Sequence, residues 1–158
     1  MAPAPAPTPA PVILGDNVEI YISSSTGGFL SGWSYLVDEL NYTSYSIADS
    51  KGAYSITQVA GGGITLKGWD AYYLTKCETC APTTNGSFVG LVPTLSPTAS
   101  VWTYASVDST HITLKDSDGL CLTVCPGCLP DIGAPHGDLV LTAPCVNLPT
   151  QVWTVAYA

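Results

Sequence analysis

The chain contains an internal repeat, and this repeat constrains its fold more than any other feature. Residues 64–67 read Ile-Thr-Leu-Lys, and the same four residues recur at positions 112–115. Two Cys-x-x-Cys motifs lie at residues 77–80 and 125–128, and the same 48 positions separate them as separate the two Ile-Thr-Leu-Lys segments. A weaker copy of the repeat begins with the Ile-Tyr-Ile of residues 20–22. Self-similarity on this scale indicates one small unit of secondary structure used several times over.

Each repeat predicts four short strands. It opens with an Ile-x-Ile or Ile-x-Leu alternation, which is typical of a half-buried strand, and a tight turn follows. The second strand carries an aromatic residue or Cys followed by Leu, and third strands are seen at residues 88–92 and 139–141. The fourth strand carries a large aromatic residue, which we expect to lie in the core, at Tyr54, Trp102 and Trp153.

A single unit of this kind has one apolar face and cannot bury it alone. Three units that close around a common axis bury that face and remove the exposed sheet edges. We therefore predict an all-β chain with the β-trefoil fold: three four-stranded repeats that form a pseudo-threefold barrel with capping hairpins. The single domain covers residues 16–158, with repeats at about 18–61, 62–109 and 110–158. A β-sandwich would not explain three equal units.

The charge of the chain and the length of its apolar runs exclude two classes of partner. Four lysines and no arginine stand against 12 acidic residues, for a net charge of −8 and a pI near 4.2. Basic side chains supply most of the affinity for nucleic acid, so no nucleic-acid partner is expected. No apolar run reaches the roughly 20 residues that span a bilayer, so no membrane insertion is expected either.

Several features favour an oxidising, extracellular setting. Six cysteines lie among 158 residues, and N-glycosylation sequons begin at Asn41 and Asn85. Residues 1–15 are rich in Ala and Pro, and we expect them to form a mobile arm at the start of a mature secreted chain. We therefore predict a secreted glycoprotein.

The third unit carries a more specific pattern. A Cys-Leu pair at Cys121 is followed by Cys145 and by a Gln-x-Trp that joins Gln151 to Trp153. This pattern resembles the repeat of the ricin B-type lectins, and the resemblance points to the fungal lectins of that family. It is good over residues 112–155, weaker in the second unit and poor in the first. The resemblance implies a carbohydrate-binding β-trefoil with a disulfide between Cys121 and Cys145.

The other four cysteines allow two interpretations. Cys77, Cys80, Cys125 and Cys128 have the spacing of a four-thiolate zinc site. Equivalent positions of adjacent units lie a third of a turn apart around a threefold barrel, so the four sulfurs would not easily converge on one ion. We favour local disulfides between residues 77 and 80 and between 125 and 128. Cross-pairing or a metal site is the alternative, and we expect no metal and no cofactor.

The resemblance also implies how a sugar is held in the family. An Asp after the Cys-Leu pair binds sugar hydroxyls, an Asn precedes the Gln-x-Trp, and an aromatic ring stacks on the sugar. In this chain the three Asp positions hold Ser31, Thr75 and Thr123. The Asn position of the third unit holds Thr150 and its stacking position holds Ala143. The chain therefore departs from the family's galactose site at each of these positions.

Two other groups of polar and aromatic residues could bind a glycan. The first crowds a turn of the second unit, where a ring beside a carboxylate could hold a sugar or where a Trp could simply pack on the barrel wall. The second belongs to the third unit, where an Asp and an Asn would line a pocket and a Gln would orient them. The candidate ligand-binding residues are Trp69, Asp70, Tyr72, Asp138, Asn147 and Gln151.

Other activities have less support in the sequence. A protease inhibitor of the β-trefoil type, presenting the loop 129–136, is the alternative function. No enzyme is expected, because His111 and His136 are the only imidazoles and no nucleophile motif accompanies them. Asp116 and Asp118 resemble the start of a calcium loop, but the later acidic ligands are missing, which favours a hairpin turn. The sequence thus predicts a lectin-like protein that binds glycans or glycoproteins without catalysis.

Overall fold

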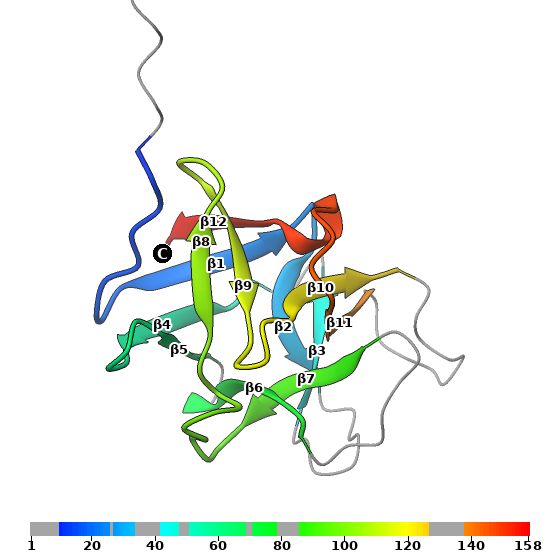
Figure 1. The fold of residues 1–158 in the computed structure, drawn as a ribbon, viewed down its shortest axis with the longest axis horizontal. Helices are drawn as coiled ribbons and strands as arrows, with labels where there is room; N and C mark the ends of the chain where they lie inside the picture. The colour runs from blue at the N-terminus through cyan, green and yellow to red at the C-terminus, as the bar shows by residue number, and fades with distance from the viewer. Residues whose placement is uncertain are drawn as a thin grey trace, which may run out of the picture.

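The computed structural model describes residues 10–25, 27–33, 42–47, 51–68, 71–78, 86–126 and 138–158. Within these residues the chain is all-β, as predicted, and a short 3-10 turn, η2 (Pro149–Gln151), precedes the last strand. The described strands are shown in Figure 1 and are, in order, β1 (Glu19–Ser24), β2 (Phe29–Trp33), β3 (Tyr42–Ile47), β4 (Ala53–Gln58), β5 (Ile64–Lys67), β6 (Tyr73–Lys76), β7 (Ser87–Val92), β8 (Thr103–Ser106), β9 (His111–Lys115), β10 (Cys121–Cys125), β11 (Asp138–Ala143) and β12 (Trp153–Tyr157). No helix in this part of the chain has the length and apolar character needed to cross a membrane.

Six of these strands pair in a closed cycle. β1 pairs with β4, β4 with β5, β8 with β9, β9 with β12 and β12 with β1, all antiparallel. A bridge between Ile64 and Trp102 completes the cycle by joining β5 to the residue before β8. Closure pairs each of these six strands on both sides, and so it protects backbone groups that an open sheet edge would expose.

The other six described strands form antiparallel pairs attached to this cycle. The pairs are β2–β3, β6–β7 and β10–β11, and they join the cycle through β1, β5 and β9. The second strands of these pairs also contact one another, since β3 pairs with β7, β7 with β11 and β11 with β3. The described part of the molecule is therefore a closed cycle with a mutually paired set of hairpins attached to it.

The turns that attach these hairpins share one geometry. In each turn the first residue donates its N–H to the carbonyl four positions later, and the residue three positions later donates back to the first carbonyl. The residue that donates this second bond has a positive φ, which glycine adopts without a steric penalty. The turns run from Ser24, Gly68 and Asp116, and the positive-φ residues are Gly27 (90°), Ala71 (60°) and Gly119 (80°).

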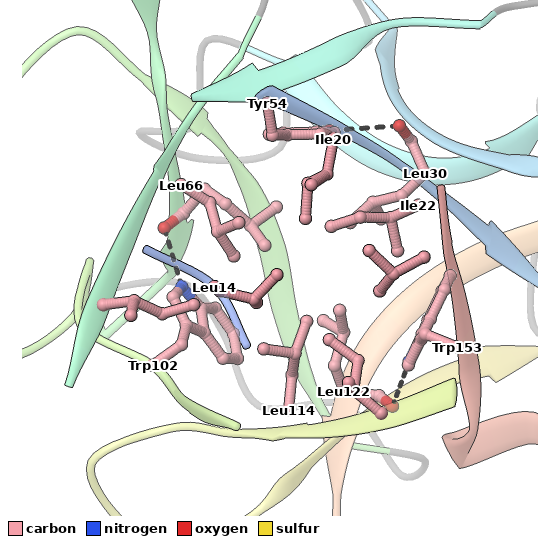
Figure 2. Close-up of a cluster of buried hydrophobic side chains, with 14 of the residues drawn as sticks. Leu14, Ile20, Ile22, Leu30, Tyr54, Leu66, Trp102, Leu114, Leu122 and Trp153 are labelled. Carbon is pink, nitrogen blue, oxygen red and sulfur yellow. Dashed lines mark hydrogen bonds between the residues drawn. The ribbon is translucent and has the colours of Figure 1, made fainter. Parts of the chain in front are cut away.

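One apolar cluster fills the interior of the described residues, and the predicted aromatic residues lie in it (Figure 2). Tyr54, Trp102 and Trp153 are at most 2% exposed, so the prediction that they belong to the core is confirmed. Burial raises the pKa of the Tyr54 hydroxyl above its ordinary value. Each polar ring atom is satisfied by a backbone carbonyl of the second strand: Tyr54 Oη donates to Leu30 O (3.1 Å), Trp102 Nε1 to Leu74 O (2.9 Å) and Trp153 Nε1 to Leu122 O (3.0 Å).

The mobile arm expected for residues 1–15 is wrong at its C-terminal end. Val12 is 7% exposed and Leu14 is fully buried in the central cluster, while Ile13 between them is 68% exposed. We call residues 12–14 the N-terminal strap. Side chains from four different positions bind its backbone: Ser106 Oγ accepts from Val12 N (2.9 Å), Tyr104 Oη accepts from Leu14 N (3.0 Å), Tyr157 Oη donates to Ile13 O (3.2 Å) and Gln58 Nε2 donates to Leu14 O.

The strap docks because its apolar side chains alternate. An alternating pair of apolar residues can enter a core from one side while the residue between them faces water. Burial of Val12 and Leu14 therefore keeps this segment docked on the domain, although the residues before it are rich in proline. Residues 1–9 lie outside the described part of the chain.

Candidate functional site

Gln151 is the last residue of η2, and its side chain connects this turn to its surroundings. Its side chain is buried, and its amide makes three hydrogen bonds. Oε1 accepts from Val146 N (2.8 Å), and Nε2 donates to Pro144 O (2.8 Å) and to Thr123 Oγ1 (3.2 Å). Both ends of the amide are therefore hydrogen-bonded, and Gln151 holds the segment 144–148 against β10.

The positions where the family carries its sugar-binding Asp are occupied by internal hydrogen bonds. Thr123 Oγ1 donates to Cys121 O (2.8 Å) in addition to accepting from Gln151. Thr75 Oγ1 lies 2.9 Å from both Tyr73 O and Ser100 Oγ, and Thr75 is buried. A hydroxyl held in this way has little capacity left for a ligand, so the departure seen in the sequence is also a departure in geometry.

The disulfide implied by the resemblance is present. Cys121 and Cys145 are bonded, with their Cα atoms 5.2 Å apart and a sequence separation of 24 residues. Cys77 and Cys125 each take part in a disulfide as well, and no bond joins the two to each other. Cys80 and Cys128 lie outside the described residues, so the local pairings 77–80 and 125–128 stay predictions.

A cleft lies where β9, β12 and the segment 147–152 meet the turn after β1. We call it the His111 cleft. Thr154 of β12 is the register partner of both His111 in β9 and Ser23 in β1, and this pairing brings sequence positions far apart into one surface. The cleft has a volume of about 330 Å³ and is lined by Ser25, His111, Asn147, Pro149, Val152 and Thr154.

The His111 imidazole in the cleft contacts the carboxylate of Asp108. Asp108 Oδ1 and Oδ2 lie 2.8 and 2.9 Å from His111 Nδ1. Oδ1 also accepts from the backbone N–H groups of Thr110 and His111, both at 2.9 Å. The Thr110 N–H, followed by the His111 side chain, lowers the pKa of Asp108 to about 2. An ionised carboxylate only accepts hydrogen bonds, so Nδ1 carries a proton and Nε2 remains as the second hydrogen-bonding atom of the ring.

Asn147 occupies a special backbone position at the rim of the cleft. Its φ is 55°, in the left-handed region that most side chains avoid and that Asn tolerates better than most. The neighbouring Val146 and Leu148 are more than half exposed. The segment is therefore a surface projection whose base is fixed by Gln151 and by the Cys121–Cys145 disulfide.

The structure places the candidate ligand-binding residues in different regions. Asn147 lines the His111 cleft and Gln151 supports it. Tyr72 is half-buried and packs against the central cluster, and Asp138 begins β11, where its partner is Ser46 of β3. Neither of these two residues lines the cleft. Several predictions fall outside the described residues: Trp69, Asp70, the sequon residues Asn41 and Asn85, His136 and the loop 129–136.

Of the residues that line the cleft, the sequence identified only Asn147 as a candidate, and the polar residues that it missed are Ser25, His111 and Thr154. Each is a common residue near a strand end, and nothing local marks it as functional. The available signal was the repeat itself, because aligned units predict that the last strand runs beside the first strands of the third and first units.

The Asp116–Gly119 segment is a hairpin turn, as the sequence favoured. Asp116 Oδ1 accepts from the backbone N–H groups of Asp118 and Leu120, both at 2.9 Å. Lys76 Nζ lies 3.1 Å from Asp116 Oδ2 and 2.6 Å from Asp118 Oδ2. The lysine therefore supplies the positive charge that faces these carboxylates. Among the described residues, no three His, Cys, Asp or Glu side chains gather as a metal site would require.

Comparison with protein families and curated proteins gives no match: no family model fits the chain, and no curated protein of similar sequence was found. Solved structures do match. A Culex salivary protein of the cysteine and tryptophan-rich family has a TM-score of 0.71 at 14% identity, over 90% of this chain and 94% of that one.

Lectins are among the similar structures. The Macrolepiota procera ricin B-like lectin in complex with lactose has a TM-score of 0.63 at 15% identity, over 93% of this chain and all of that one. The Polyporus squamosus lectin bound to a human-type influenza-binding epitope has a TM-score of 0.68 at 14% identity, over 90% of this chain and 49% of that one. The chain therefore shares the fold of ricin B-like lectins, and identities this low carry the fold alone.

Proposed function

We propose that this β-trefoil chain is a secreted, lectin-like protein that binds glycans without catalysis. The observation that carries the proposal is the shared fold, which extends over 93% of the chain to a lectin whose structure holds lactose. The third unit adds support, because its Cys121–Cys145 disulfide and the hydrogen bonds of Gln151 retain the framework of the resemblance. The His111 cleft supplies a surface with hydrogen-bonding groups beside apolar atoms, which suits a sugar ring.

We further infer that the fold consists of three equivalent units. The support is the recurrence of the same local chemistry at matching positions. The turns from Ser24, Gly68 and Asp116 have the same hydrogen bonds, and an aromatic ring of each fourth strand donates to a carbonyl of the second strand. The Ser100–Thr75 contact corresponds to the Gln151–Thr123 contact in the next unit.

The setting we propose is oxidising and extracellular. The bonded state of Cys77, Cys121, Cys125 and Cys145 supports it, because disulfides persist mainly in such compartments. Peptide mapping of the unreduced protein tests the remaining pairings. We expect peptides that join residue 77 to 80 and residue 125 to 128, and a 77–125 linkage would contradict the assignment.

A glycan array tests the function directly. The oxidised protein, labelled on a lysine and applied at micromolar concentration, should bind a coherent subset of glycans that share a terminal sugar. Protein denatured by reduction and alkylation is the control and should not bind. Signals at background across a broad array would refute the proposal. The inhibitor alternative predicts instead that a protease is blocked stoichiometrically while the array stays blank.

A further inference from the structure

We propose that the His111 cleft binds one uncharged monosaccharide unit, with Asn147, His111, Ser25 and Thr154 as its hydrogen-bonding groups. This inference rests on the proposed function and assigns it a place. The place differs from the positions where the ricin B-type resemblance would put the sugar, since those positions hold Ser31, Thr75 and Thr123, and none of them lines the cleft.

The lining of the cleft has the two kinds of surface that a sugar ring needs. Pro149 and Val152 present apolar atoms, against which the C–H groups of a ring can pack. Around them stand an amide, an imidazole and two hydroxyls. Within the described part of the chain, the side chains of Ser25, Asn147 and Thr154 make no intramolecular hydrogen bond. These groups are therefore available to a ligand's hydroxyls.

The size of the cleft limits the ligand. Its volume of about 330 Å³ accommodates a single ring and its first substituents, and lies at the lower end of small-molecule sites. The cleft is also shallow, because Ser25, Asn147 and Pro149 are exposed while His111, Val152 and Thr154 are half-buried. A terminal sugar of a larger glycan fits such a site, and the remainder of the glycan would extend into solvent.

Contacts within the protein hold the groups of the cleft in position. His111 and Thr154 lie on paired strands of the closed cycle. The projection that carries Asn147 is fixed by the Cys121–Cys145 disulfide and by the Gln151 amide. Asp108 orients the His111 ring through Nδ1. Binding to groups that are already in position avoids much of the entropy cost of ordering them.

The charge near the cleft selects against acidic sugars. No lysine lines it, and the Asp108 carboxylate lies 2.8 Å from His111 Nδ1. The net charge of −8 acts in the same direction. A sialic acid would therefore bring its carboxylate toward negative charge without a lysine to pair with, whereas a neutral pyranose carries no such penalty.

Nuclear magnetic resonance on the intact, oxidised, ¹⁵N-labelled chain tests the assignment. The probes are the methyl glycosides of galactose, glucose, mannose and N-acetylglucosamine, free N-acetylneuraminic acid, and the glycan with the strongest array signal. We expect saturable shifts of the Asn147 side-chain amide and of the backbone amides of Ser25, His111 and Thr154 with a neutral sugar. Shifts with N-acetylneuraminic acid alone would overturn the choice of an uncharged ligand.

A matched pair of variants separates binding from folding. Asn147→Gly removes the amide but keeps a residue that accepts positive φ, and it should weaken binding about fivefold or more. Asn17→Gly makes the same change at the other described Asn with positive φ (63°), outside the cleft, and should leave binding unchanged.

The two proposals fail in different ways. If glycans bind and the shifts lie elsewhere, with Asn147→Gly as tight as the unaltered protein, the cleft assignment is wrong and the lectin function stands. If the array is blank and no probe shifts any resonance, the lectin function itself is wrong.

Discussion

Replacement of Leu14 by Ala tests whether the N-terminal strap is part of the folded domain. The Leu14 side chain is fully buried in the central cluster, and the strap backbone is bound by Tyr104, Gln58 and Tyr157. Truncation of a buried Leu to Ala typically costs about 2–5 kcal/mol, which combines lost apolar burial with the cavity left behind. The loss has an upper limit here, because it cannot exceed the free energy with which the strap docks on the closed cycle.

Urea denaturation followed by tryptophan fluorescence measures this loss. With an m-value of about 2 kcal/mol/M, a loss of about 3 kcal/mol moves the unfolding midpoint down by roughly 1.5 M. Ile13→Ala is the matched control. The Ile13 side chain is 68% exposed, so its truncation should change stability by no more than about 0.5 kcal/mol.

The comparison of these two variants decides the question. A Leu14→Ala midpoint equal to that of Ile13→Ala would refute the argument that burial of Leu14 holds the strap. Hydrogen exchange gives a second measurement, since the Leu14 amide donates to Tyr104 Oη and should exchange faster once the strap is released.

Three further predictions follow from contacts described above. Trp102→Phe and Trp153→Phe each remove the ring N–H that donates to a buried carbonyl, so each should lower the free energy of unfolding in urea by about 1–3 kcal/mol. A difference of more than about 2 kcal/mol between the two losses would argue against equivalent units. Lys76→Met leaves the Asp116 carboxylate, whose side chain is 1% exposed, without its cation, so the free energy of unfolding should fall by about 3–5 kcal/mol. Adding Asp116→Asn to this variant should restore part of the loss, and an unchanged unfolding midpoint for Lys76→Met would contradict this role. The Asp108 carboxyl should titrate near pH 2 when followed by ¹³C NMR, and a titration midpoint near 3.8 would exclude the Thr110 and His111 contacts in solution. Because the folded pKa lies below the ordinary value of 3.8, the contribution of Asp108 to stability is present above about pH 4 and is lost as the pH falls toward 2.

Much of the fold could be predicted from the sequence because strands and turns leave local patterns. The alternation in residues 64–67 and 112–115 corresponds to β5 and β9, and the Asp-Ser-Asp-Gly of residues 116–119 corresponds to a hairpin turn. Aromatic residues at matched positions, such as Trp102 and Trp153, lie in the core because a large ring in a repeated strand is a packing residue.

The N-terminal strap could not be predicted in the same way. Its Ala- and Pro-rich surroundings indicate an extended chain, and extended conformation by itself does not reveal a docking site. Whether Leu14 is buried depends on Tyr104 and Gln58, which are far away in the sequence. The alternation of Val12 and Leu14 around an exposed residue was the local signal, and it is too short to distinguish from chance.

The candidate site was only partly within reach of the sequence. Asn147 and Gln151 were identified because they stand beside a recognisable Gln-x-Trp. His111 and Ser25 join them only through the pairing of β12 with β9 and β1, and the role of Asp108 depends on hydrogen bonds within one turn. Such contacts are properties of the assembled sheet, and a linear pattern carries no record of them.

The pairing of β12 with β1 has a consequence for how the molecule could be rewired. β4 pairs with β5 and β8 with β9, and in both cases a short turn connects the two strands. β12 and β1 are also antiparallel neighbours, but they are the last and first described strands and no turn connects them. Ala158 N lies 2.9 Å from Glu19 O, and Tyr157 Oη lies 3.2 Å from Ile13 O. A linker from residue 158 to the residues before the strap would therefore keep the strap, and the chain could be reopened at residues 59–63. Any segment attached at residue 158 would emerge beside the start of β1, next to the strap.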